Sequence, residues 1–259
     1  SRGTVELSFN EYSPFGQVRV FDNDHLFINE RRMCGYQSTG PDSSEAKMVE
    51  YELAAFDGTD LSILNVGFGC GITLREEMRR TSRPVDVVEI NEAVLSAAEK
   101  FTPDLTQTDR VKIVQDDGLK HIRESDTIYD TILIDIEDPV VAHSSDLYTL
   151  EAFKLIHDSL SENGTFALWT FQPGDRFVDI LYYTMKDAFP YVYVYADVAV
   201  ASKVPFRTLE YVPTTPYEIN TLDRKTLTEA YIELAGSLAP ITDPALLPEK
   251  FRLEPDSAQ

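Results

Sequence analysis

Three acidic residues lie within four positions in the segment Ile134-Asp135-Ile136-Glu137-Asp138-Pro139. The apolar run before them, Thr131–Asp135, predicts a strand. Ligands of open α/β sheets bind at the carboxyl ends of the strands. Carboxylates at such an edge can bind a cation or orient an amine, so Asp135 and Asp138 are candidate catalytic residues. An ordinary acidic surface loop is the alternative interpretation.

A glycine-rich turn follows another apolar run. Ile63–Val66 leads into Gly67, Gly69 and Gly71, with Cys70 between the last two. Glycines allow a sharp turn and let backbone amides approach a ligand closely. The spacing G-x-G-x-G differs from the G-x-G-x-x-G of dinucleotide-binding folds. It therefore favours a methyltransferase-type nucleoside site over a site for NAD.

An acidic residue ends the next predicted strand. Glu89, followed by Ile90, lies 22 residues beyond Gly67. A carboxylate at about 20 residues accepts hydrogen bonds from both ribose hydroxyls in such sites. An exposed glutamate at a strand end is the alternative, which the glycine turn makes less attractive.

The third predicted strand ends in Asp116-Asp117-Gly118. An aspartate here can accept a hydrogen bond from an adenine amino group, or it can cap the following helix. Two adjacent aspartates allow both roles at once.

Strands and helices alternate around these candidate residues, which predicts a parallel sheet covered on both faces. We expect an α/β, doubly wound, mostly parallel sheet of class I methyltransferase (Rossmann-like) type. Trp169 ends the fifth strand, where it would line a pocket or fill the core. The predicted strands are Leu61–Val66, Val85–Ile90, Val111–Val114, Thr131–Asp135 and Thr165–Thr170. The predicted helices lie near residues 73–80, 91–101, 117–123, 147–160 and 175–188.

The ends of the chain have different patterns. Short alternating segments at 18–21, 25–28 and 35–38 predict a β-meander within residues 1–42, followed by a helix over 44–56. The nucleoside-binding catalytic domain is expected over 43–240 and a polar tail over 241–259. Near its end, 191–195 and 206–212 are expected to pair as an antiparallel edge, and 224–236 to be helical.

Composition excludes several classes of function. The net charge of −21 opposes binding to nucleic acid and favours a cationic substrate, although it can also simply aid solubility. No apolar run or leader predicts a membrane span or a signal peptide. Cys34 and Cys70 do not form a disulfide framework, which is typical of a reducing, cytoplasmic compartment. Neither the cysteines nor the four histidines have metal-ligand spacing, so no metal is expected.

Residues 61–160 resemble the spermidine synthases, the polyamine aminopropyltransferases, and the N-terminal strands do so more weakly. That family has a glycine-rich loop followed by Leu-Arg-Glu, then Val-Glu-Ile-Asp, Asp-Gly, Asp-Ser-(Ser/Thr)-Asp-Pro and Leu-Phe-x-x-x-x-Phe/Tyr. The corresponding residues here are Gly67–Gly71 with Leu74-Arg75-Glu76, Val88–Asn91, Asp117-Gly118, Asp135, Asp138, Pro139, Leu147-Tyr148 and Phe153.

The resemblance implies a mechanism and a set of ligands. The donor would be decarboxylated S-adenosylmethionine, held by the glycine loop, Glu89, the Asp116–Gly118 segment and Pro139. A substrate amine would attack the carbon next to the sulfonium, and methylthioadenosine would leave. Asp135 would orient the amine and accept its proton, with Asp138 and Glu50 helping to bind the acceptor. The resemblance also implies a homodimer.

Two departures from the family pattern concern the acceptor side. Cys70 occupies the position of an aspartate in the glycine loop, and Met48-Val49 replaces Tyr-(His/Gln) before Glu50. A strict putrescine acceptor is therefore not expected. Three hypotheses follow: an aminopropyltransferase; an enzyme that uses intact S-adenosylmethionine for methyl or 3-amino-3-carboxypropyl transfer, including cyclisation; and a non-catalytic binding protein.

Overall fold

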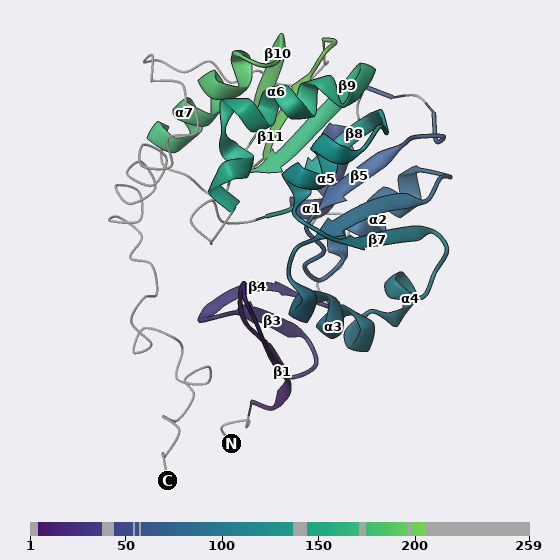
Figure 1. The fold of residues 1–259 in the computed structure, drawn as a ribbon, viewed down its shortest axis with the longest axis vertical. Helices are drawn as coiled ribbons and strands as arrows, with labels where there is room; N and C mark the ends of the chain where they lie inside the picture. The colour runs from purple at the N-terminus through teal and green to yellow at the C-terminus, as the bar shows by residue number, and fades with distance from the viewer. Residues whose placement is uncertain are drawn as a thin grey trace.

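The computed structural model describes residues 5–37, 44–53, 55–56, 58–136, 144–170, 175–195 and 198–205. These residues form two sheets (Figure 1): a seven-stranded sheet with helices on both sides and a smaller sheet, in purple, from the N-terminal region. The described residues include no helix that is long and apolar enough to cross a membrane.

The N-terminal sheet is a four-stranded antiparallel meander, as expected. Its strands, in order, are β1 (Leu7–Ser13), β2 (Gly16–Phe21), β3 (His25–Ile28) and β4 (Arg31–Gly35). The strand predicted at 35–38 is wrong, because β4 ends at Gly35 and a turn follows. β1 was not predicted, since its side chains are all exposed or partly buried and the apolar alternation is weak.

The seven-stranded sheet confirms the predicted fold class. Its order is β10-β11-β9-β8-β5-β6-β7, and β6, β7, β8 and β9 run parallel to β5. The strands are β5 (Ile63–Val66), β6 (Val85–Glu89), β7 (Val111–Gln115), β8 (Tyr129–Ile134), β9 (Leu160–Trp169), β10 (Tyr191–Tyr195) and β11 (Val198–Ser202).

The helices follow the strands in alternation, and side chains mark several of their starts. Asn91, Asp117 and Thr149 each cap a helix by accepting a hydrogen bond from a backbone amide of its first turn. The helices are α1 (Ser44–Glu52), α2 (Ile72–Arg80), α3 (Glu92–Phe101), α4 (Pro103–Thr106), α5 (Gly118–Glu124), the 3₁₀ helix η1 (Ser144–Tyr148), α6 (Leu150–Asp158) and α7 (Asp175–Lys186).

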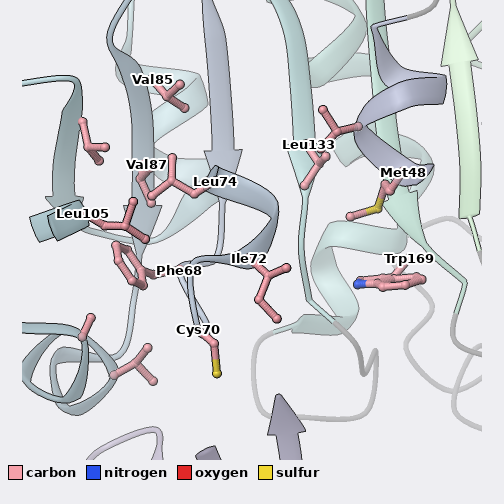
Figure 2. Close-up of a cluster of buried hydrophobic side chains, with 14 of the residues drawn as sticks. Met48, Phe68, Cys70, Ile72, Leu74, Val85, Val87, Leu105, Leu133 and Trp169 are labelled. Atoms are coloured by element: carbon pink, nitrogen blue, oxygen red, sulfur yellow. The ribbon is translucent and has the colours of Figure 1, made fainter. Parts of the chain in front are cut away.

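The sheet separates two apolar cores, because successive side chains of a strand point to opposite faces. One core contains Val87 and Leu133 with side chains from α1, α2, α3 and the N-terminal sheet (Figure 2). The other contains Val88 and Ile134 with side chains from α5, α6 and α7. Both faces of the central strands are therefore buried.

The antiparallel edge contains a strand that was not predicted. β10 pairs with Val198–Ser202, which also pairs with β9. All five residues of β11 are buried, so this strand lacks the apolar–polar alternation that would identify it. Residues 206–212, the helix predicted over 224–236 and the tail over 241–259 lie outside the described residues, and the domain boundaries remain predictions.

Candidate active site

Three of the predicted site segments meet at one edge of the sheet. Strand order reverses at β5, which has β6 on one side and β8 on the other. The amide of Asp135 donates to the carbonyl of Val66 at 2.9 Å, and the amide of Gly67 donates to the carbonyl of Val88 at 2.8 Å. The glycine loop and Asp135 therefore follow directly from neighbouring strands, at the switch point where α/β sheets bind ligands.

The glycine loop has a backbone conformation that requires glycine. Gly67, Gly69 and Gly71 have φ values of 101°, 50° and 72°. A Cβ atom on Gly67 would lie 2.7 Å from the carbonyl oxygen of Asp135, so the loop and the acid lie in direct contact. Gly71 then caps the N-terminus of α2, where free amides and the helix dipole favour a negatively charged or electron-rich group.

Glu89 ties the end of β6 to the glycine loop. Its Oε2 accepts from the amide of Phe68 at 2.8 Å, and its Oε1 accepts from the amide of Asn91 at 2.8 Å. Burial raises its pKa, and the backbone amides around it, those of Phe68 and Asn91 first, oppose that rise. The two hydrogen bonds from Phe68 and Asn91 use one lone pair of each carboxylate oxygen, so Glu89 can still accept from a ribose.

Asp135 is held in place by Trp169. The indole Nε1 donates to Oδ1 of Asp135 at 3.0 Å. Ile134 of β8 pairs with Leu168 of β9. The residues that follow them, Asp135 and Trp169, therefore lie side by side. Trp169 is therefore both a core residue (Figure 2) and a direct partner of the acid. The hydroxyl of Tyr148 donates to the carbonyl of Ile136 at 2.8 Å and fixes the backbone beyond the acid.

The electrostatic environment raises the pKa of Asp135 to about 6. Burial is the largest cause, and the charges of Glu45 and Glu89 add to it. The Trp169 hydrogen bond and the nearby Thr73 hydroxyl lower the pKa, although the Thr73 oxygen has no hydrogen bond of normal geometry to a described residue. An acid of this kind is ionised at neutral pH and accepts a proton more readily than an ordinary aspartate.

The Asp116–Gly118 segment combines the two roles considered for it. Asp117 Oδ1 accepts from the amide of Lys120 at 2.8 Å and caps α5. Asp116 is partly buried and pairs with Lys120 Nζ at 2.8 Å, and this hydrogen bond is the main reason that its pKa is lowered. A Cβ atom on Gly118 would lie 2.5 Å from Cγ1 of Val66, so glycine allows α5 to approach β5.

Cys70 requires a correction. It forms a disulfide with Cys34, and their Cα atoms are 6.1 Å apart. The interpretation of the two cysteines as unbonded is therefore wrong. The bond joins β4 to the glycine loop, and Figure 2 shows the Cys70 sulfur pointing toward the N-terminal strands. A separation of 36 residues carries no local pattern, so only the tertiary structure reveals this pair.

The acceptor side is described in part. Glu50 is exposed, on the side of α1 away from the buried Met48 and Glu52, so the structure does not bring it to Asp135. Glu45, one turn earlier, is partly buried, and its charge reaches Asp135. Sequence reasoning missed Glu45, because nothing in the local sequence separates it from other surface acids. Asp138 and Pro139 lie outside the described residues.

The described residues contain no group of three or more His, Cys, Asp or Glu side chains that could hold a metal ion. The acids of this site are instead held by backbone amides, an indole and a lysine. Among the described residues, the arrangement thus offers acceptors at the ends of β6 and β7 beside the glycine loop and Asp135, a buried acid with a raised pKa.

Comparisons with known proteins give a consistent result. The family described as Spermine/spermidine synthase domain matches residues 48–198, more than half of the chain. A polyamine aminopropyltransferase of Clostridium botulinum (strain Alaska E43 / Type E3) is 38% identical over 106 residues, 39% of this chain and 37% of that protein. One from Methanocaldococcus jannaschii is 31% identical over 167 residues, 62% of this chain and 53% of that protein. The chain thus spans about two fifths to one half of these curated relatives.

Solved structures share the fold. A spermidine synthase in complex with the transition state analogue AdoDATO has a TM-score of 0.67 at 19% identity, covering 88% of this chain and 84% of that one. The spermidine synthase from Thermotoga maritima has a TM-score of 0.63 at 20% identity, covering 88% and 83%.

Proposed function

We propose, because the chain belongs to the spermine/spermidine synthase family, that it transfers an aminopropyl group from decarboxylated S-adenosylmethionine to an amine and releases methylthioadenosine. The observation that carries the proposal is the position of Asp135. It is oriented by Trp169 and lies beside the glycine loop at the switch point of the sheet. The matched residues 48–198 include all three features.

The donor would be held by the residues that end β5, β6 and β7. Glu89 would accept from the ribose hydroxyls, the amides of Gly67–Gly71 would line the nucleoside, and Asp116 would accept from the adenine amino group. The solved relative that contains AdoDATO supports a donor of this chemical class. Of the remaining predicted contacts, Ile90 follows Glu89 directly, and Pro139 is assigned from the resemblance alone.

The reaction needs a neutral amine nitrogen and a proton acceptor. The nitrogen lone pair forms the new C–N bond at the carbon next to the sulfonium, and the C–S electron pair stays on sulfur as methylthioadenosine leaves. A free amine has a pKa of about 10.4, so a nearby carboxylate favours its protonated form. Asp135 would therefore capture and orient the amine, and it would take the proton as bond formation makes the nitrogen more acidic.

The acceptor would be a cation bound by carboxylates. Glu45, whose charge reaches Asp135, would take this role together with Asp138, whereas the exposed Glu50 lies on the other side of α1. A net charge of −21 would raise the local concentration of such a substrate.

A second candidate function is the use of intact S-adenosylmethionine. The observation that favours it is the Cys34–Cys70 disulfide, which leaves the glycine loop without the negative charge that the family pattern has at this position. A neutral residue there would not repel the carboxylate of the intact donor.

Product analysis distinguishes these candidates. The protein is incubated with decarboxylated or intact S-adenosylmethionine and a panel of diamines and monoamines, and the nucleoside product is identified by mass spectrometry. Methylthioadenosine from the decarboxylated donor alone is expected. S-adenosylhomocysteine, or methylthioadenosine from the intact donor, would favour the second candidate. Tight donor binding without any product would contradict both.

Replacement of Asp135 tests its role. Asp135→Asn is expected to lower kcat by at least about 100-fold, because general-base catalysis typically contributes this much, while the donor Kd changes little. Asp126→Asn serves as a control, since it makes the same change at an exposed position between α5 and β8. An Asp135→Asn protein with unchanged kcat would remove Asp135 from the mechanism.

We also propose that the protein is a homodimer without a resident metal, with domain boundaries after residues 42 and 240. Light scattering with a known extinction coefficient measures the dimer directly.

A cytoplasmic location remains a prediction, and the disulfide argues against it, because such bonds persist mainly in oxidising compartments. Free thiols are alkylated as the cells are opened without reductant, and the protein is then isolated. The fraction of Cys34 and Cys70 that carries the alkyl group measures whether the cell keeps this pair reduced.

A further inference from the structure

A cluster of polar side chains is buried between the sheet and helices α1 and α2. All six side chains are at most 1% exposed, which is unusual for glutamate in particular. We call this group the buried polar cluster. It consists of Glu52, Asn65, Thr73, Glu77, Thr131 and Thr165.

Hydrogen bonds connect the cluster in two groups, one across α1, β8 and β9 and the other between β5 and α2. Thr131 Oγ1 donates to Glu52 Oε1 at 2.5 Å, and Thr165 Oγ1 lies 2.9 Å from Thr131 Oγ1. Asn65 Nδ2 donates to Glu77 Oε2 at 3.0 Å. The second carboxyl oxygens, Glu52 Oε2 and Glu77 Oε1, have no partner among the described residues. Two fully buried carboxyl groups thus have no cationic partner in the interactions of the described chain.

The strand registers place the cluster directly behind Asp135. Thr131 of β8 and Asp135, four residues later, point to the same face of the sheet. Thr165 and Trp169 of β9 do the same. Thr73 lies next to Asp135, and Glu77 lies one helical turn further along α2. The cluster therefore extends from the interior of the domain to the acid at the sheet edge.

The carboxyl groups of Glu52, Glu77 and Asp135 influence one another's pKa values. Burial raises the pKa of Glu52 to about 8, and the charge of Asp135 adds to that rise while the Thr131 hydroxyl opposes it. Burial, followed by the charge of Glu52, raises the pKa of Glu77 well above its ordinary value, and Asp135 contributes further. The other charged groups that act on Asp135 are Glu45 and Glu89, which are both acids.

We propose that Glu52, buried in the cluster against Thr131, is a positioning residue that sets the strength of Asp135 as the proton acceptor of the proposed reaction. The part of this inference that concerns catalysis rests on the proposed function. Like charges that are both buried disfavour each other, so a negative charge that Glu52 gains as pH rises makes Asp135 hold a proton more firmly. Glu77, whose Oε2 accepts from Asn65 Nδ2, is the second buried carboxyl group of the cluster.

Trp169 offers a readout that needs no substrate. It is the only tryptophan in the sequence, and its Nε1–H group bonds to Asp135. The single indole ¹H–¹⁵N resonance is followed from about pH 5 to about pH 9.5. The wild type is expected to show two steps, one for Asp135 and one for Glu52. Glu52→Gln is expected to lose the upper step and to keep the lower one, which also confirms that the variant is folded.

Glu77→Gln is the matched control, because it makes the same change at the other buried carboxyl, which bonds to Asn65 and not to Thr131. It is expected to keep both steps. An upper step that survives in Glu52→Gln, or a wild-type protein with a single step, overturns the proposal. An upper step that disappears in Glu77→Gln and persists in Glu52→Gln would assign the charge to Glu77 and would equally overturn it.

The catalytic arm uses the pH dependence of kcat for aminopropyl transfer. Wild-type kcat is expected to rise again, several-fold, above about pH 8, and Glu52→Gln is expected to lose this second rise with an unchanged donor KM. Identical profiles would overturn the role of Glu52. If no transfer occurs at all, the indole titration still decides whether Glu52 and Asp135 are coupled, so failure of the proposed function is distinguishable.

Discussion

The properties of Asp135 come from side chains that lie far from it in the sequence. Its hydrogen-bond donor Trp169 is 34 residues away, and the acids that raise its pKa belong to α1 and β6. The residue type marks it as a candidate, but burial and neighbours decide its strength as a base. The same aspartate on an exposed loop would ionise far below neutral pH.

Trp169→Phe tests this dependence. Phenylalanine fills most of the space but donates no hydrogen bond, so the carboxylate loses a stabilising donor and the pKa of Asp135 rises. The acidic limb of the profile of kcat/KM against pH is expected to move upward by on the order of one pH unit. Tyr129→Phe is the control, because it removes a hydroxyl whose hydrogen bond goes to Asp86, at the other end of β8. An unmoved limb in Trp169→Phe would show that the indole only fills space.

At the scale of elements, the glycine loop is fixed from three sides. Glu89 holds it through the amide of Phe68, Gly67 touches the backbone of Asp135, and the disulfide to Cys34 joins it to β4. The N-terminal sheet therefore acts on the donor side of the site through a covalent bond. We expect the loop to be ordered before a ligand binds, which reduces the entropy lost on binding.

Reduction of the disulfide is expected to destabilise the protein. Closing a loop of 36 residues restricts the unfolded chain, which corresponds to about 3–4 kcal/mol in the loop-entropy treatment and to a fall in Tm on the order of 10 °C. Calorimetry with and without a dithiol reductant measures it. The Cys34→Ser/Cys70→Ser double variant should melt at one temperature under both conditions. A wild-type Tm that is insensitive to complete reduction would contradict this account.

For the whole molecule, acidity is distributed unevenly. Most of the excess of 44 acidic over 23 basic residues can be solvated, but the buried polar cluster places two carboxyl groups in the interior. Their pKa values lie above those of the unfolded chain, so their protonated forms favour folding. The free energy of unfolding therefore depends on pH through two buried residues, Glu52 and Glu77.

The free energy of unfolding is expected to fall as pH rises. The contribution of Glu52 is fully present below its unfolded pKa, near 4.5, and is lost as pH rises through its folded value of about 8. The loss amounts to a few kcal/mol and is measured by urea unfolding from about pH 5 to about pH 9. Glu52→Gln should make the profile shallower, while Glu77 keeps part of the slope. Glu50→Gln, which makes the same change at an exposed position of α1, should not. Parallel profiles for all three proteins would contradict a buried, protonated Glu52.

The sequence by itself determined the alternation of strands and helices, the glycine turn and the acids that end β6 and β8. These features depend on local periodicity and backbone conformation, which neighbouring residues encode. Only the tertiary structure decided the Cys34–Cys70 bond, the contact of Trp169 with Asp135 and the burial of Glu52 against Thr131, 79 residues away. Such contacts depend on how faces of distant elements meet, and no spacing along the chain records that.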